Sequence, residues 1–375
     1  MKFEPELMRM LDGTPVTQAS QWPARRKELL NILEENIYGV TPAAPASVTG
    51  TVTKEETKVC AGHAKLQYIN LSFDAPLGTA EFPFHLFVPT DGKKHPVFVL
   101  LNFRPDVYDM YYPAEEIIDN GFALAVINYQ AVATDDNDFT NGIAAKFPRT
   151  GAKNEWGKIG LWAYAASRVI DYLETREEIE ASHVAVIGHS RLGKTALWCG
   201  AQDERVLLSC SNDSGCAGAT YEHCKHEGAE TVKRIYTTFP FWFCPRYAEY
   251  IDDEPMPQPH YTYLPDQMMV NPRHGEKLPF DQHFLIAACA PRFVAVGSAS
   301  RDDWADQHSE KLSCIGASPA WQLFGRPGYI GPETPCEIGD NFDEGDVAYH
   351  LRHGVHFLSR ADWLAYMAFF KRLCQ

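Results

Sequence analysis

Five near-continuous apolar runs constrain the fold of this chain more than any other feature. They are rich in Val, Ile, Leu and Ala and lack the strict alternation of a half-exposed strand. Strands of this kind are covered on both faces, as in a mainly parallel sheet. The runs are HPVFVLLNF (95–103), GFALAVINY (121–129), SHVAVIGHS (182–190), VLLSCSND (206–213) and RFVAVGSAS (292–300).

Helical patterns lie between and after these runs. They cover WGKIGLWAYAASRVIDYLETR (156–176), RLGKTALWCGAQD (191–203) and DWLAYMAFFKRLC (362–374). Alternation of strand and helix predicts an α/β sandwich of three layers with a mainly parallel central sheet. Residues 51–90 instead alternate apolar and polar side chains, which predicts antiparallel strands with one solvated face.

The organisation of the chain indicates a single domain over residues 1–375, because no repeat or Gly/Ser linker divides it. We expect residues 1–50 to form an N-terminal helical extension. Two segments break the strand–helix alternation: 214–280 is rich in aromatic residues and Pro, and 311–350 in Gly and acidic residues. Both are expected to be cap insertions at the carboxyl edge of the sheet, where α/β folds bind ligands.

The charge balance excludes some classes of partner. A formal net charge of −15 argues against nucleic acid or an anionic membrane surface, since both require a basic face. No run approaches the ~18 apolar residues of a membrane span. The first residues, MKFEPELMRMLDGTPV, lack the apolar core of a secretory signal. We therefore expect a cytoplasmic protein, or a secreted or periplasmic one if a signal has been removed, and the oligomeric state stays open.

Ten cysteines are present without a C-x-x-C pair, and several lie inside apolar runs, which favours free buried thiols. Cys210, Cys216 and Cys224 lie near His223 and His226, but their spacings match no zinc pattern. We expect no metal and no cofactor.

The strongest local signal is VAVIGHSRLGKTALW (184–198), in which a buried strand runs through Gly188 and Ser190 directly into a helix. A serine on such a tight turn projects above the sheet at a helix N-terminus, where backbone N–H groups stabilise an oxyanion. Leu192 replaces the second glycine of the G-x-S-x-G pattern, and Gly193 follows it. We predict that Ser190 is a nucleophile; the alternative is a helix N-cap serine.

A nucleophilic serine needs a histidine base, which in this fold lies in the loop before the last helix. The segment RHGVHFLSRADW places His353 and His356 there. His356, nearer the helix, is the preferred base, and His353 is the alternative.

Two carboxylates compete to orient that histidine. Asp302 follows the fifth apolar run in SASRDDWADQHSE, together with Asp303 and Asp306, and Asp213 ends the fourth run. Two nearby carboxylates would raise each other's pKa. Asp302 is the preferred choice, and a helix cap or a loop carboxylate is the alternative for either residue.

Several motifs in order resemble carbohydrate esterase family 15, the glucuronoyl esterases, in its bacterial branch. They are GHSRLGKTALW, SNDSGC, GAETVKRIYTTFPFWFC, DQHFLIAACAPR and DDWAD, and the resemblance covers roughly residues 5–375. It implies an α/β-hydrolase fold and a serine esterase that needs no metal. Such enzymes cleave esters between 4-O-methyl-glucuronic acid of xylan and lignin alcohols.

The resemblance also implies roles for individual residues. Ser190 matches the nucleophile, His356 the base, and Arg191 an arginine that stabilises the oxyanion beside the backbone donors. The family varies in its acid, which stands at the place of Asp213 in some members and of Asp302 in others.

Three further residues match sugar-binding positions of the family. Lys194 matches a lysine that hydrogen-bonds the uronate hydroxyls, Glu230 a glutamate that binds a sugar hydroxyl, and Trp304 a tryptophan that flanks the sugar. The DQH motif is expected to precede a buried helix, with His283 structural rather than a second base.

Other functions remain open on this scaffold. The substrate could be an acetyl-xylan or another sugar ester, because the specificity segments 214–280 and 311–350 have no shape in the sequence alone. A catalytically silent carbohydrate-binding protein is the alternative from a different class.

Overall fold

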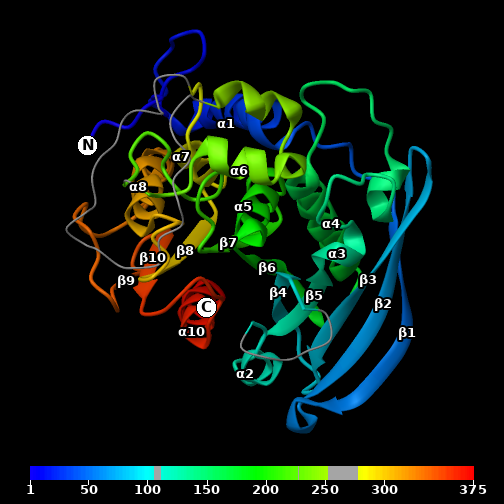
Figure 1. The fold of residues 1–375 in the computed structure, drawn as a ribbon. Coiled ribbons are helices and arrows are strands. Elements are labelled where there is room, and N and C mark those ends of the chain that lie inside the picture. The colour runs from blue at the N-terminus through cyan, green and yellow to red at the C-terminus, as the bar shows by residue number, and fades with distance from the viewer. Residues whose placement is uncertain (105–110, 227, 252–277) are drawn as a thin grey trace.

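A ten-stranded sheet forms the centre of the molecule (Figure 1). The computed structural model describes residues 1–104, 111–226, 228–251 and 278–375. The strand order is β1-β2-β3-β5-β4-β6-β7-β8-β10-β9. The strands are β1 (Val48–Val59), β2 (Ala64–Ala75), β3 (Gly78–Pro89), β4 (His95–Asn102), β5 (Ala123–Asn128), β6 (Ile179–His189), β7 (Val206–Asn212), β8 (Phe293–Ala299), β9 (Asn341–Phe342) and β10 (Val347–Arg352).

The sheet is parallel from β5 to β10 and antiparallel at both edges. The five apolar runs of the sequence are β4 to β8, and the alternating segment is β1 to β3. Strand β1 is mostly exposed, whereas β4 is buried along nearly its whole length. The predicted mainly parallel sheet with an antiparallel extension is confirmed.

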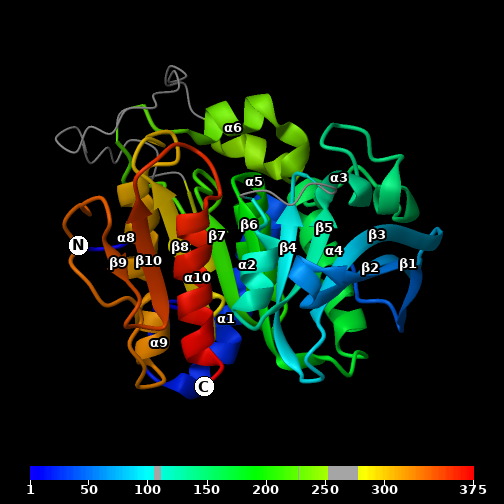
Figure 2. The same ribbon diagram turned by 90° about the horizontal axis from the view of Figure 1, so that it is seen from below.

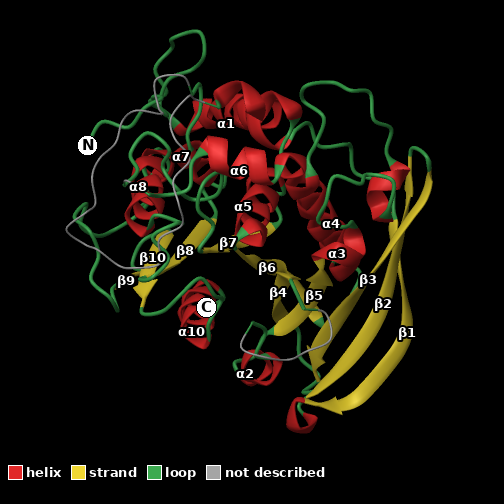
Figure 3. Ribbon diagram, viewed as in Figure 1, coloured by secondary structure: helices red, strands yellow, loops and turns green. Residues whose placement is uncertain are grey.

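Helices cover both faces of the parallel part (Figure 3). In Figure 1, α10 and α2 lie on one face, and α1, α4, α5, α7 and α8 lie on the other. The helices are α1 (Trp22–Leu33), α2 (Ala114–Asp119), α3 (Tyr129–Val132), α4 (Lys158–Leu173), α5 (Arg191–Gln202), α6 (Val232–Thr238), α7 (Gln282–Ala287), α8 (Gln307–Ala317), α9 (Pro319–Gln322) and α10 (Arg360–Leu373). The three-layer α/β architecture follows the prediction.

Alternation along the central strands divides the core in two. Val97, Val99 and Leu101 of β4 belong to the larger cluster, which also contains the buried residues of α4 and α5. Phe98 points to the opposite face, where its ring centroid lies 5.0 Å from that of Phe370 in α10. Both faces of the strand are therefore packed against helices, which explains the continuous apolar sequence.

The expectation that 311–350 is an insertion is wrong for part of that segment. It contains the end of α8 and most of β10, which pairs in parallel with β8 and is buried throughout. His350 and Arg352 give this strand a polar sequence, and their burial is compensated by Asp362 of α10.

The segment 214–280 reaches the carboxyl edge of the sheet. Helix α6 lies beyond the ends of the parallel strands (Figure 2), and residues 227 and 252–277 of this predicted insertion lie outside the described residues. Trp242 and Phe243 in this segment are buried.

All ten cysteines are free, and nine of them are buried. In the described part of the chain, no helix combines the length and the apolar character of a membrane span.

The turn between β6 and α5 is constrained by a close backbone contact. Ser190 adopts φ 57° and ψ −127°, a conformation that side chains rarely adopt. A Cβ at Gly188 would lie 2.1 Å from the carbonyl oxygen of Leu192. Glycine at position 188 therefore allows the strand and the first turn of α5 to approach each other closely.

Replacing Gly188 by Ala is expected to lower the free energy of unfolding by about 1–3 kcal/mol, because the new methyl group overpacks against backbone that cannot move freely. Chemical denaturation measures this loss. Gly92→Ala is the control: Gly92 has φ +78° but open space around it, so its substitution strains only a surface turn. Equal losses in both variants would contradict a steric role for Gly188.

Glu310 of α8 holds the chain segment that follows β7. One carboxylate oxygen accepts hydrogen bonds from the backbone N–H groups of Ser214 (2.8 Å) and Gly215 (2.9 Å), and the other accepts from the hydroxyl of Ser298 (2.6 Å). Burial raises the pKa of Glu310 to about 7. An uncharged side chain with a hydrogen-bond acceptor, such as glutamine, should therefore preserve these contacts at neutral pH.

Glu310→Gln is expected to remove a pH dependence of stability. A folded-state pKa of about 7 against an ordinary value near 4.5 means that wild-type stability falls as pH rises from about 4.5 to 7, by up to about 3 kcal/mol. Melting temperatures between pH 4.5 and 8 test this. The melting temperature of Glu310→Gln should rise relative to that of the wild type as pH increases. Glu344→Gln, at an exposed position, should show no such relative increase. Parallel profiles for wild type and Glu310→Gln would contradict it.

Candidate active site

Ser190 opens into a pocket at the N-terminus of α5. The cavity measures about 180 Å³. Its lining includes all eight residues that the sequence singled out as catalytic or sugar-binding. These are Ser190, Arg191, Lys194, Asp213, Glu230, Asp302, Trp304 and His356.

His356 lies in the loop between β10 and α10 and pairs with Asp302. Its Nδ1 is 2.5 Å from an oxygen of Asp302, which is buried at the end of β8. The imidazole is 36% exposed. A hydrogen bond at Nδ1 fixes the ring and leaves Nε2 to exchange a proton with a nucleophile. His353, the alternative base, is exposed and does not line the pocket.

Asp213 makes different contacts. Its backbone has φ 45°, and its carboxylate accepts a hydrogen bond from the Ala299 N–H (2.6 Å) and another from Arg352 (3.3 Å). Burial is the main cause that raises the pKa of Asp213 well above its ordinary value, and the neighbouring charge of Asp302 adds to it. Asp213 is therefore held by the scaffold beside the His356–Asp302 pair.

Asp213, Asp302 and His356 offer donor atoms within 4.8 Å of one another, which raises the question of a metal site. The 2.5 Å between His356 and Asp302 is a hydrogen-bond distance. Two ligands that each lie about 2.0–2.1 Å from one zinc ion in tetrahedral geometry are about 3.3 Å apart. The observed spacing between His356 and Asp302 suits a direct hydrogen bond better than two ligands of one zinc ion.

Asp303 and Asp306, the other acids of this loop, lie outside the pocket lining. Asp306 caps α8 by accepting the N–H of Ser309. His283 is fully buried in α7, where its Nε2 lies 3.0 Å from the carbonyl oxygen of Pro5. Burial lowers the pKa of His283 to about 3. It contacts the N-terminal segment rather than the pocket.

Arg352 organises the loop that carries His356, and the sequence analysis missed it. Its guanidinium donates to the carbonyl oxygens of Val355 (3.1 Å) and Phe357, which flank the histidine. It also pairs with Asp362 at 2.5 Å and with Asp213 at 3.3 Å. The single signal in the sequence is a basic residue four positions before the histidine, which is too common to be specific.

Arg191 forms an ion pair with Asp135 and lies against an aromatic wall. Its guanidinium carbon is 4.4 Å from the ring centre of Trp242 and 5.2 Å from that of Phe239. Asp135 comes from the loop after α3 and was not predicted from the sequence, because nothing local distinguishes it within ATDDND.

Lys194, Glu230 and Trp304 lie at another side of the pocket. The Nζ of Lys194 is 4.0 Å from a carboxylate oxygen of Glu230 and 2.7 Å from the carbonyl oxygen of Cys216. Burial lowers the pKa of Lys194 and raises that of Glu230, while each charge favours the other. The Glu230 N–H donates to the Trp304 carbonyl oxygen (3.0 Å), which joins the two loops.

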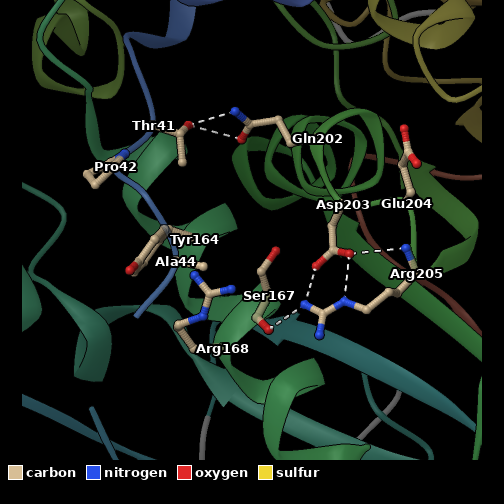
Figure 4. Close-up of a pocket in the computed structure, with 10 residues that line it drawn as sticks. All are labelled: Thr41, Pro42, Ala44, Tyr164, Ser167, Arg168, Gln202, Asp203, Glu204 and Arg205. Atoms are coloured by element: carbon tan, nitrogen blue, oxygen red, sulfur yellow. Dashed lines mark hydrogen bonds and ion pairs between the residues drawn. The ribbon is translucent and has the colours of Figure 1, made fainter. Parts of the chain in front are cut away.

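A second pocket, of about 260 Å³, lies beside the middle of α4 and the C-terminal end of α5 (Figure 4). Its arginines are already paired: Arg168 with Asp171 at 2.5 Å, and Arg205 with Asp203 at 2.8 Å. It holds no pair of serine and histidine. The pocket around Ser190 is the better candidate for chemistry.

Comparison with known proteins also indicates an esterase. A family model described as "Glucuronyl esterase, fungi" matches residues 77–325, more than half of the chain. Carbohydrate esterase MZ0003, from an unknown prokaryotic organism, is 33% identical over 97% of this chain and 88% of its own length. A 4-O-methyl-glucuronoyl methylesterase of Schizophyllum commune is 27% identical over 90% of this chain and 79% of its own length.

A solved structure supports the assignment of the fold. A promiscuous carbohydrate esterase family 15 (CE15) enzyme from a marine bacterial metagenome has a TM-score of 0.84 and 32% identity, over 99% of this chain and 97% of that one. The predicted α/β-hydrolase fold is confirmed. The chain therefore belongs to the glucuronoyl esterase family, carbohydrate esterase family 15.

Proposed function

We propose that this protein hydrolyses esters of glucuronic acid or 4-O-methyl-glucuronic acid, such as those that join xylan to lignin, through an acyl-enzyme on Ser190. One observation carries the proposal: a serine on a strained strand–helix turn shares a small pocket with a paired His356 and Asp302. Membership of the esterase family supports the reaction type, and relatives named as glucuronoyl methylesterases support the substrate class.

The mechanism follows from the placement of the groups. His356 takes the proton of the Ser190 hydroxyl as its oxygen attacks the ester carbonyl, and Asp302 stabilises the imidazolium that forms. Backbone N–H groups at the start of α5 and the Arg191 guanidinium stabilise the oxyanion. The alcohol leaves with a proton from His356, and water then releases the uronic acid by the same steps in reverse.

The polar side of the pocket suits a sugar ring. Lys194 and Glu230 supply a donor and an acceptor for hydroxyl groups, and Trp304 supplies a flat apolar face beside them. A pocket with these groups binds a small-molecule or oligosaccharide uronate ester. The acetyl group of an acetyl ester would leave most of these contacts unused.

The first experiment compares the hydrolysis of several esters by the wild-type protein and by Ser190→Ala. We expect wild-type protein to hydrolyse benzyl glucuronate, and Ser190→Ala to lower kcat by roughly 10⁴-fold or more, because the nucleophile is lost. Release of 4-nitrophenol from 4-nitrophenyl acetate and of acetate from acetylated xylan is measured in parallel. Acetate release without turnover of the uronate ester would overturn the substrate class in favour of a deacetylase. Absence of all turnover with retained sugar binding would favour a binding protein.

The choice between the two acids gives a second test. Asp302→Asn should lower kcat by roughly 10³–10⁴-fold, because an uncharged amide neither fixes the tautomer of the imidazole nor stabilises its positive charge. Asp213→Asn should keep kcat within about tenfold and act mainly on stability, since Asp213 anchors Ala299 and Arg352. Steady-state kinetics and thermal unfolding of both variants separate the two roles. A larger loss of kcat in Asp213→Asn would reverse the assignment.

A further inference from the structure

Asp135 receives hydrogen bonds from the neighbouring helix α3 and from two segments that are distant in the sequence. One carboxylate oxygen accepts the indole N–H of Trp242 (2.7 Å), and the other accepts from the Tyr129 hydroxyl (3.0 Å) and from Arg191. Its side chain is 11% exposed. The three donors compensate the partial desolvation of this carboxylate.

Arg191, the charged partner of Asp135, is surrounded by aromatic side chains. The Arg191 guanidinium lies near three rings, at 4.4 Å from Trp242, 5.2 Å from Phe239 and 5.7 Å from Phe103. Trp242 and Phe239 are themselves stacked, with ring centres 3.8 Å apart. The Nε of Arg191 is buried and has no hydrogen-bond partner among the described residues. The side chain is therefore closely enclosed around its Nε, which limits its movement.

This arrangement bears on the energetics of the proposed reaction. A free arginine side chain loses conformational freedom when it is fixed in one position. A donor that is already fixed where negative charge develops needs no such reorganisation at the moment of reaction. The ion pair with Asp135 removes that freedom before the substrate arrives.

We infer that Asp135 is a positioning residue for the oxyanion-stabilising Arg191: its carboxylate holds the guanidinium in the pocket wall. The inference rests on the proposed function, since Arg191 meets an oxyanion only if Ser190 attacks the carbonyl of an ester. Asp135 affects the reaction rate only by holding Arg191 in place.

The test is a double-mutant cycle. Asp135→Asn should lower kcat by about 10- to 100-fold with KM changed less than about threefold, because the contact matters mainly in the transition state. In an Arg191→Ala background, the same Asp135→Asn change should lower kcat by no more than about twofold. Asp135→Glu, which keeps the charge, should recover part of the lost kcat.

Asp136→Asn is the matched control. Asp136 is the neighbouring, exposed carboxylate of the same loop, and its hydrogen bonds from Thr134 and Asp138 stay within the loop. It should keep wild-type kcat. Melting temperatures of all variants separate loss of folding from loss of rate, and Asp135→Glu is the second variant if Asp135→Asn unfolds.

The outcomes separate this inference from the proposed function. Kinetics on 4-nitrophenyl acetate are measured as well as on benzyl glucuronate, so that any Ser190-dependent turnover can be used. Unchanged kcat in Asp135→Asn, or an equal loss with and without Arg191, would overturn the positioning role while leaving the esterase assignment intact. Failure of the wild type on benzyl glucuronate would instead overturn the proposed substrate.

Discussion

The buried charge of Arg352 is the constraint on which one half of the site depends. A guanidinium out of water must be fully compensated, and removing one partner of a buried pair costs about 3–5 kcal/mol. Arg352 meets this demand with Asp362, Asp213 and the carbonyl oxygens around His356. The loop conformation that orients His356 is therefore the same one that provides hydrogen-bond acceptors for Arg352. Arg352 therefore joins helix α10, the end of strand β7 and the loop that carries His356.

The same network explains why the two carboxylates near His356 differ. Asp213 has its oxygens occupied by Arg352 and the Ala299 N–H, so it serves as part of the frame. Asp302 is the acid at 2.5 Å from Nδ1. The contacts of each carboxylate, rather than its position after a strand, show which of the two holds the imidazole.

Much of this arrangement could be predicted from local sequence. The near-continuous apolar runs predicted β4 to β8, and the helical patterns between and after them predicted α4, α5 and α10. The turn at Ser190 is visible because glycine is required beside it. The topology of parallel strands also indicated that Ser190 and His356 meet at one edge. Strand β10 was missed because His350 and Arg352 look solvated until Asp362 pairs with both. Asp135 was missed for the same physical reason: its partners come from α3, α5 and the segment after α6.

The size of the pocket has a consequence for polymers. Its volume of about 180 Å³ is smaller than the roughly 300–1,000 Å³ of sites that enclose drug-sized ligands. A hollow of that size encloses a single ring and leaves a chain outside. Under the proposed function, this pocket would hold one uronic acid substituent of a long polysaccharide. The described residues would then contact little of the alcohol side of the ester bond. Insoluble, irregular material then presents the same target wherever that substituent protrudes.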